Sequence, residues 1–165
     1  MAVPRIILGN IFDSQCQTIT NPINCAGIMG AGLALQFRHY FPDMHADYVA
    51  RCQSGEVRLG CPYLFKRSEL PWILNFPTKR FPRDKSDFLS IIRGMDFVRE
   101  HYKDWGITSL AIPALGCGLG GLDLLRVGPG LYAGLKRLDI PTELYVTTRS
   151  DFDLLCELIR ASRLL

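Results

Sequence analysis

The chain has 165 residues, a length that suits one domain with a sizeable hydrophobic core, and we expect residues 1–165 to form a single domain. With 48% hydrophobic and 21% charged residues, the composition excludes a disordered chain, and the net charge of +3 permits an anionic partner without requiring one. The six cysteines form no CxxC pair, which argues against a zinc site and favours reduced thiols.

No segment has the length of a signal-peptide core or a membrane span, so we expect a cytoplasmic protein. Strand-like and helix-like segments alternate along the chain, which predicts an α/β fold with one sheet covered on both faces. Strands are expected at 5–8, 18–23, 63–66, 72–76, 107–112 and 144–147.

Helices are expected between most of these strands. The first spans 33–40 and is stopped by Pro42, and the second is capped by Asp43 and runs to 51. The longest follows a capping Ser86 and ends at Gly106. A fourth is expected to start at Pro129, and the last to span 152–164.

A glycine-rich segment, NCAGIMGAGLALQF from Asn24, joins the second expected strand to the first helix. Its glycines allow close approach of a ligand to the backbone, and the helix N-terminus adds unpaired N–H donors, a combination that suits phosphate. For this segment taken alone, a turn that merely needs glycine for its conformation is an equal alternative.

A second segment, GCGLGGLD over 116–123, follows the fifth expected strand and matches GxGxxG. Asp139 and Glu143 lie near the spacing of a ribose-binding acid, which leaves a Rossmann-type site open, although the motif lies late in the chain for that fold. Two such loops can hold a diphosphate from opposite sides through backbone N–H groups. A Walker A lysine and an HExxH helix are absent from the sequence, which excludes those NTPase and zinc-peptidase classes.

Both loops resemble those of the macrodomain family, which binds ADP-ribose. Together with NFPTK over 75–79, the two strings look like the DarG antitoxin branch of that family, and the resemblance covers most of the chain. It implies a three-layer α/β/α macrodomain with a central mixed, about six-stranded sheet. It also implies ADP-ribose as ligand or product, with no cofactor and no metal.

The resemblance implies a set of ADP-ribose contacts. Asn10, beside Ile11, stands where an aspartate commonly contacts the adenine amine, and Asn24 would hydrogen-bond the distal ribose. The two loops would enclose the distal ribose and the diphosphate through Gly27, Ile28, Met29, Gly30, Ala31, Gly32, Leu33, Gly116, Cys117, Gly118, Leu119, Gly120 and Gly121. No aromatic platform for adenine can be assigned after the last strand.

Lys79 is the implied catalytic residue. In similar proteins a lysine attacks the anomeric carbon of the distal ribose and forms an imine-type intermediate that water releases, which requires the neutral amine. Protein-directed relatives carry an aspartate where this chain has Gly120, so the glycine agrees with the DarG pattern. Asp123 is a second candidate for activating water, although capping the next helix is its favoured role.

The DarG branch removes ADP-ribose from thymidine bases in DNA. The resemblance therefore implies ADP-ribosylated DNA as substrate and a cognate ADP-ribosyltransferase toxin as partner of a monomeric protein. Arg80, Arg83 and Lys85, interleaved with Phe76 and Phe81, would lie beside the nucleic acid, although a basic run is by itself more typical of a solvated surface. Two alternatives stay open: a hydrolase for ADP-ribose on proteins or phosphorylated ADP-ribose metabolites, and a non-catalytic ADP-ribose reader.

Overall fold

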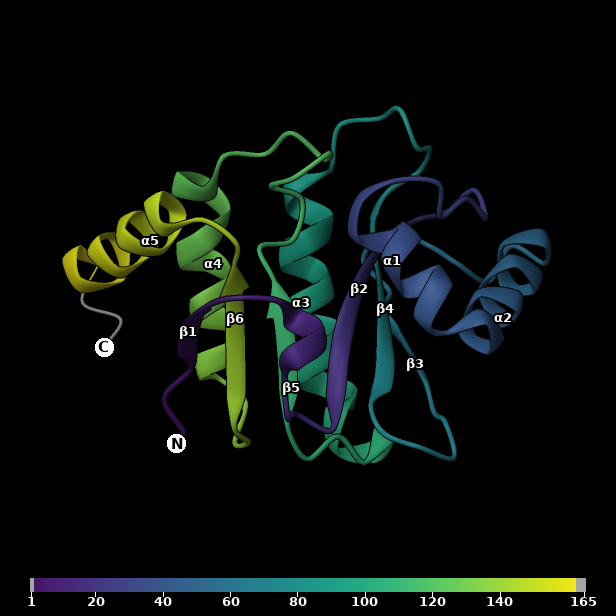
Figure 1. Cartoon of the computed structure of the whole chain (residues 1–165), viewed down its shortest axis with the longest axis horizontal. Helices are drawn as coiled ribbons and strands as arrows, with labels where there is room; N and C mark the ends of the chain where they lie inside the picture. Colours follow the sequence, from purple (N-terminus) through teal and green to yellow (C-terminus); the bar gives the residue numbers. More distant parts are fainter. Residues whose placement is uncertain (1, 163–165) are drawn as a thin grey trace.

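A computed structural model describes residues 2–162, which form six strands, five α-helices and one short 3-10 helix (Figure 1). In chain order the elements are β1 (Arg5–Leu8), η1 (Ile11–Asp13), β2 (Thr18–Asn24), α1 (Gly32–Tyr40), α2 (Pro42–Gln53), β3 (Tyr63–Phe65), β4 (Trp72–Lys79), α3 (Phe88–Trp105), β5 (Leu110–Pro113), α4 (Leu124–Lys136), β6 (Thr142–Val146) and α5 (Arg149–Ala161).

The strands form one sheet in the order β1-β6-β5-β2-β4-β3. Neighbouring strands are parallel except at one edge, where β3 pairs antiparallel with β4. Helices cover both faces, and in Figure 1 α4 lies behind β6 and α3 behind β5. The expected three-layer α/β/α arrangement with a mixed six-stranded sheet is confirmed.

The hydrophobic core is divided between the two faces of the sheet, because successive side chains of a strand point to opposite faces. Leu110 and Ile112 of β5 pack with α3, α4 and α5, whereas Ala111 between them packs with η1, α1 and α2. In β6, Leu144 and Tyr145 divide in the same way. Because both faces of the central strands are buried, these strands are held firmly in place. The loops that follow them therefore start from fixed positions.

Two predicted helix caps were wrong. α2 begins at Pro42, because proline fits the first helical position, where the missing N–H is not needed. Asp43 therefore lies in the first turn, with its Oδ2 3.4 Å from Nε of Arg67. α3 is capped not by Ser86 but by the next residue, Asp87, whose side chain accepts a hydrogen bond from the N–H of Ser90.

The prediction that Pro129 starts α4 was also wrong. Asp123 caps this helix by accepting from the N–H of Leu125 at 3.0 Å, and Pro129 lies inside it. α5 begins at Arg149 rather than 152, because Thr148 provides the cap, and its predicted end at 164 lies outside the described residues.

The predicted strands are all present: β1 has the predicted bounds, and the other five have shifted ends. The shift that bears on the site is in β4, which runs on to Lys79 instead of ending at 76, while β5 covers 110–113 instead of 107–112. Within residues 2–162, every helix is too short or too polar to cross a membrane.

Candidate functional site

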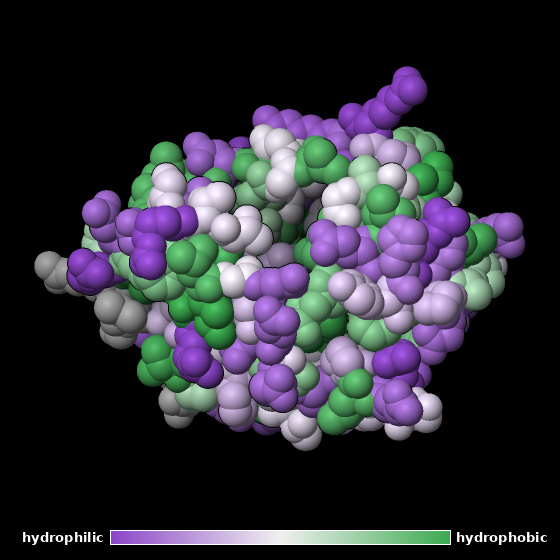
Figure 2. Space-filling view, viewed as in Figure 1, coloured by the Kyte–Doolittle hydropathy of each residue, from purple (hydrophilic) through white to green (hydrophobic). Residues whose placement is uncertain are grey.

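A cavity of about 700 Å³ opens where four parallel strands end. The carboxyl ends of β2, β4, β5 and β6 lie at one edge of the sheet, which is the usual place for a ligand in α/β folds. Figure 2 shows the hollow in the upper part of the face, bordered by pale and hydrophobic residues. Its size is within the range of small-molecule sites.

The first glycine loop, residues 24–32, is held in shape by Asn24. The side-chain oxygen of Asn24 accepts from the N–H of Ala26 at 3.0 Å, and its amide nitrogen donates to the carbonyl of Ile28 at 2.7 Å. The hydroxyl of Tyr48 lies 2.8 Å from that side-chain oxygen, and burial raises the pKa of Tyr48, which keeps the hydroxyl protonated. The amide of Asn24 has a second N–H, which stays available to a ligand.

The same loop leads into α1 without a side-chain cap. Ala31 is the N-cap residue and has no side chain that can accept from the first turn of the helix. Gly32 has φ +58°, a left-handed conformation that favours glycine. The first N–H groups of α1 are therefore available at the cavity wall, as in sites that bind anions.

The second glycine loop, residues 116–121, forms the facing wall. Gly116 and Gly121 have positive φ values of 79° and 71°. Internal hydrogen bonds fix the loop: the N–H of Gly121 donates to the carbonyl of Gly118, and the N–H of Leu122 donates to that of Gly116. The N–H groups of residues 118–120 donate to no acceptor within 2–162 and are free for a ligand.

Position 120 has room for glycine alone, because Ser86 and the backbone of Gly116 lie against it. A Cβ at this position would lie 2.1 Å from Oγ of Ser86 and 2.7 Å from the carbonyl oxygen of Gly116. Ser86 lines the cavity, is 6% exposed, and has a hydroxyl that no described residue satisfies. Ser86 was predicted as a helix cap, and its place in the cavity wall was not predicted.

Lys79 is the last residue of β4 and lines the cavity from the side of the first loop. It lies opposite Asn24 in the strand register, and its carbonyl accepts from the N–H of Cys25 at 3.1 Å. Its half-buried side chain forms no ion pair or hydrogen bond with the part of the chain that the structure describes. The amine is therefore not committed to a structural role.

Most of the predicted ADP-ribose contacts line the cavity. They are Asn24, Ile28, Gly30, Ala31, Gly32, Leu33, Gly116, Cys117, Gly118, Leu119 and Gly120. The predicted contacts that lie outside its lining are Asn10, Ile11, Gly27, Met29 and Gly121. Asn10 instead caps η1 by accepting from the N–H of Phe12 at 3.0 Å, and Met29 is buried in the core.

The end of the cavity at β6 was not predicted. Tyr145, Thr147 and Asp151 line it, although these residues carry no motif. Asp151 lies in the first turn of α5 near Cys117. Burial raises the pKa of the Cys117 thiol to about 11, and the carboxylates of Asp151 and Asp123 add to this shift. The thiol is therefore neutral at ordinary pH.

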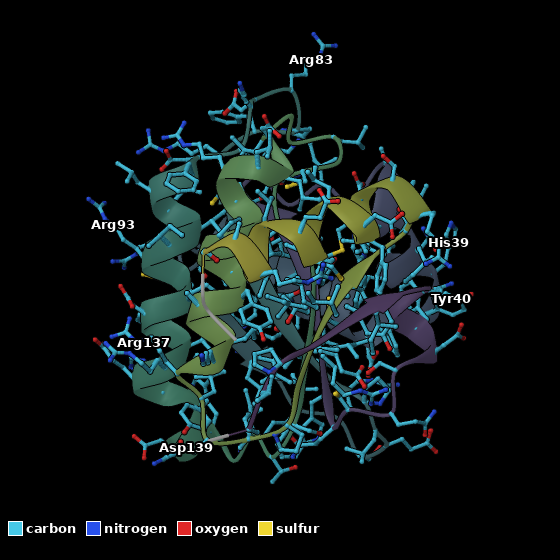
Figure 3. The ribbon with its side chains drawn as sticks, turned by 90° about the vertical axis from the view of Figure 1, so that its left-hand side faces the viewer. His39, Tyr40, Arg83, Arg93, Arg137 and Asp139 are labelled. Carbon is cyan, nitrogen blue, oxygen red and sulfur yellow. The ribbon has the colours of Figure 1, made fainter. Side chains whose placement is uncertain are left out.

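The basic run after β4 lies largely outside the cavity. Arg80, Arg83 and Lys85 do not line it, and Arg83 points into solvent at the tip of its loop (Figure 3). Phe76 is fully buried in the core and has no face free for a base, whereas Phe81 is 60% exposed. The expected interleaving of two aromatic residues with the basic run is therefore wrong for Phe76.

Asp139 and Glu143, the two candidate ribose-binding acids of a Rossmann-type site, lie away from the cavity. Asp139 precedes β6, at the edge of the sheet opposite the cavity, and in Figure 3 it lies at the opposite end from Arg83. Glu143 accepts from the hydroxyl of Ser14 at 2.7 Å and pairs with Arg5. Neither acid lines the cavity.

Metal-ligating side chains are not grouped in the described part of the chain. No set of three or more histidine, cysteine or acidic residues within 2–162 could hold an ion, and all six cysteines are free thiols. The polar groups of the residues that line the cavity include backbone N–H groups, one amine, one amide, hydroxyls, the Cys117 thiol and the Asp151 carboxylate. This set can bind an anionic ligand and present a nucleophile to it.

Comparison with known proteins yields relatives over most of the chain. It is 39% identical over 159 residues to the DNA ADP-ribosyl transferase-DNA ADP-ribosyl glycohydrolase fusion protein of Thermosipho africanus, with 86% of this chain and 41% of the relative covered. The solved structure of Thermosipho africanus DarTG in complex with ADP-ribose matches with a TM-score of 0.82 at 40% identity, covering 86% of this chain and 41% of that one. The macrodomain of Thermus aquaticus DarG matches with a TM-score of 0.83 at 30% identity, covering 90% and 100%.

This chain spans about 40% of the length of the curated relatives that it matches first. The family described as Macro domain matches residues 20–129, which include most of β2, all of β4 and β5, and both glycine loops. The sheet, the cavity and these matches agree, and the chain belongs to the macrodomain family.

Proposed function

We propose that this chain is an ADP-ribosyl glycohydrolase that removes ADP-ribose from thymidine bases in DNA, with Lys79 as nucleophile. The observation that carries the proposal is that Lys79 lines the same cavity as both glycine loops and has no ionic or hydrogen-bonding partner among the described residues. A site that binds a diphosphate through backbone N–H groups thereby has, at one end, an amine that is free to react.

The length and polarity of the cavity support ADP-ribose as its ligand. It extends from the end of β6 to the end of β4, which are three strand spacings apart in the sheet, or about 14 Å. The two glycine loops face each other between these ends, where the diphosphate would lie. We place the adenosine toward Tyr145 and Asp151, and the distal ribose toward Asn24 and Lys79.

The proposed reaction consumes one water. The neutral amine of Lys79 bonds to the anomeric carbon of the distal ribose while the bond from that carbon to the thymine nitrogen breaks, and the base leaves with a proton. The ribosyl-lysine opens to an imine, water adds to the same carbon, and ADP-ribose leaves as the amine is regenerated. Gly120 offers no carboxylate for this step, and Asp123 caps α4 outside the cavity.

The names of the relatives support the choice of substrate. Curated relatives from Thermus aquaticus and Mycobacterium tuberculosis, each 33% identical, are named DNA ADP-ribosyl glycohydrolase. The fusion of transferase and glycohydrolase in one Thermosipho chain supports a cognate ADP-ribosyltransferase as the partner of this protein.

The test is release of ADP-ribose from an oligonucleotide ADP-ribosylated on thymidine. We expect turnover by the wild type and a loss of at least about a thousandfold in kcat for Lys79→Ala, because removing a nucleophile removes the covalent route. The control is Lys103→Ala, an exposed lysine in the last turn of α3, which should keep wild-type turnover.

Three other outcomes would contradict the proposal. Calorimetric binding of ADP-ribose without release from any substrate would identify a reader. Faster release from an ADP-ribosylated protein than from the oligonucleotide would assign a protein substrate. Undiminished release by Lys79→Ala would exclude the lysine mechanism.

A further inference from the structure

A second hollow, of about 430 Å³, carries positive charge and no acidic side chain in its lining. Its lining is Cys25, Val57, Arg58, Leu59, Arg80 and Phe81, and we call it the arginine cleft. Arg58 and Arg80 are both exposed, and neither forms an ion pair with any residue in the described range 2–162. Two unpaired guanidinium groups in one hollow suit an anionic occupant.

A strip of backbone separates the arginine cleft from the ADP-ribose cavity. Asn24 and Lys79 line the cavity, while the next residues, Cys25 and Arg80, line the cleft. The two segments are joined, because the N–H of Cys25 lies 3.1 Å from the carbonyl oxygen of Lys79 and 3.0 Å from that of Arg80. In the proposed reaction Lys79 attacks the anomeric carbon of the distal ribose. The base that is bonded to this carbon therefore lies close to the strip.

Phe81 gives the cleft an exposed aromatic ring. The carboxylate of Asp84 accepts from the N–H of Phe81 at 3.1 Å, and the N–H of Asp84 donates to the carbonyl of Phe81 at 3.1 Å. This closed turn presents the ring to solvent at 60% exposure, beside the guanidinium groups. Cations for phosphates and a ring for base stacking are the two components of single-strand binding sites. An acidic peptide would use the arginines but gain nothing from stacking.

We propose that the arginine cleft holds the nucleic-acid strand next to the modified nucleotide, with Arg58 and Arg80 on phosphates and Phe81 stacked on a base. This inference rests on the proposed function, since it places the leaving group of that reaction. Arg58 comes from the segment between α2 and β3, far in sequence from the basic run after β4. Arg83 and Lys85 line neither hollow, so Arg80 is the member of the basic run that contributes to the proposed contact.

The experiment compares two substrates: a single-stranded ADP-ribosylated oligonucleotide, and ADP-ribosylated thymidine without flanking phosphates. For Arg58→Gln and for Phe81→Ala we expect the ratio of kcat/KM, oligonucleotide to nucleoside, to fall roughly tenfold. With Arg58→Gln, the slope of log kcat/KM against log salt on the oligonucleotide should become shallower by about 0.7, the value for one phosphate contact on a single strand. Arg137→Gln loses the same charge at a residue that does not line the cleft, lies in the lower half of Figure 3 away from Arg83 at the top, and pairs with Asp96; it should leave the ratio unchanged.

An unchanged ratio in the Arg58→Gln and Phe81→Ala variants would overturn the inference, as would equal losses on both substrates. Fluorescence anisotropy with an unmodified labelled oligonucleotide separates this inference from the proposed function. Arg58-dependent binding by a protein that hydrolyses neither substrate would retain the cleft and reject the proposed reaction, whereas no binding would reject the cleft. Displacement of the oligonucleotide by poly-glutamate of equal charge, at equal concentration, would also reject it and indicate an acidic protein partner.

Discussion

Ser86 has a polar group that the folded chain leaves unsatisfied. Its hydroxyl is buried against Gly120 and has no hydrogen-bond partner among the described residues, and Ser86 is one of the residues that line the cavity. An unpaired buried hydroxyl costs free energy, and on the wall of a cavity a bound ligand can remove that cost. Ser86 lies beside the second glycine loop, with its N–H bonded to the carbonyl of Gly120, which places it near the proposed diphosphate or the distal ribose.

Ser86→Ala should therefore separate stability from binding. We expect the free energy of unfolding to stay the same or rise by about 1 kcal/mol, because an unsatisfied group is removed. We expect the affinity for ADP-ribose to fall roughly five- to tenfold, because one ligand hydrogen bond is lost. Urea unfolding and calorimetry with ADP-ribose measure the two effects.

Ser90→Ala provides the matched control. Ser90 is as buried as Ser86, but its hydroxyl donates to the carboxylate of Asp87. Its removal should lower the free energy of unfolding by about 1 kcal/mol and leave affinity unchanged. A Ser86→Ala variant that is destabilised and binds ADP-ribose normally would assign Ser86 a purely structural role.

At the level of elements, the sequence predicted the strands well and the helix starts poorly. Alternating burial and apolar runs identify strands over several residues, so an error at one end does not remove the element. A helix start depends on which of two adjacent residues turns its side chain toward the first turn. Ser86 and Asp87 are both good caps, and the path of the chain selects Asp87. Gly106 was predicted correctly as the end of α3, because its left-handed φ of 79° favours glycine.

Two variants of Asp123 distinguish a helix-capping role from a catalytic role. Its carboxylate caps α4, so Asp123→Ala should lower the free energy of unfolding by about 1 kcal/mol. Asp123→Asn should keep both the stability and the release of ADP-ribose, because asparagine caps as well as aspartate. Chemical unfolding and the oligonucleotide assay check both variants. A stable Asp123→Asn variant that has lost activity would show that the carboxylate activates water.

At the scale of the whole molecule, the site combines segments that the sequence separates. The glycine loops and Lys79 could be predicted, because each lies in a contiguous motif. The β6 end of the cavity could not, because Tyr145 and Asp151 reach it only through the strand order that places β6 beside β5. The arginine cleft was missed for the same reason, since Arg58 and Arg80 meet only in the folded chain.

Half-buried thiols couple the stability of the whole fold to alkaline pH. Burial raises the pKa of both Cys25 and Cys117 from 9.0 to about 11. The unfolded chain therefore releases these protons first, and between pH 9 and 11 it binds fewer protons than the native state. The free energy of unfolding must then fall as pH rises through this window, and the stabilisation is fully present below pH 9. Urea midpoints at pH 8, 9.5 and 10.5 should decline in that order, and the decline should be shallower in Cys25→Ser/Cys117→Ser, whose hydroxyls do not titrate there. A double variant with the same decline as the wild type would show that other groups cause it.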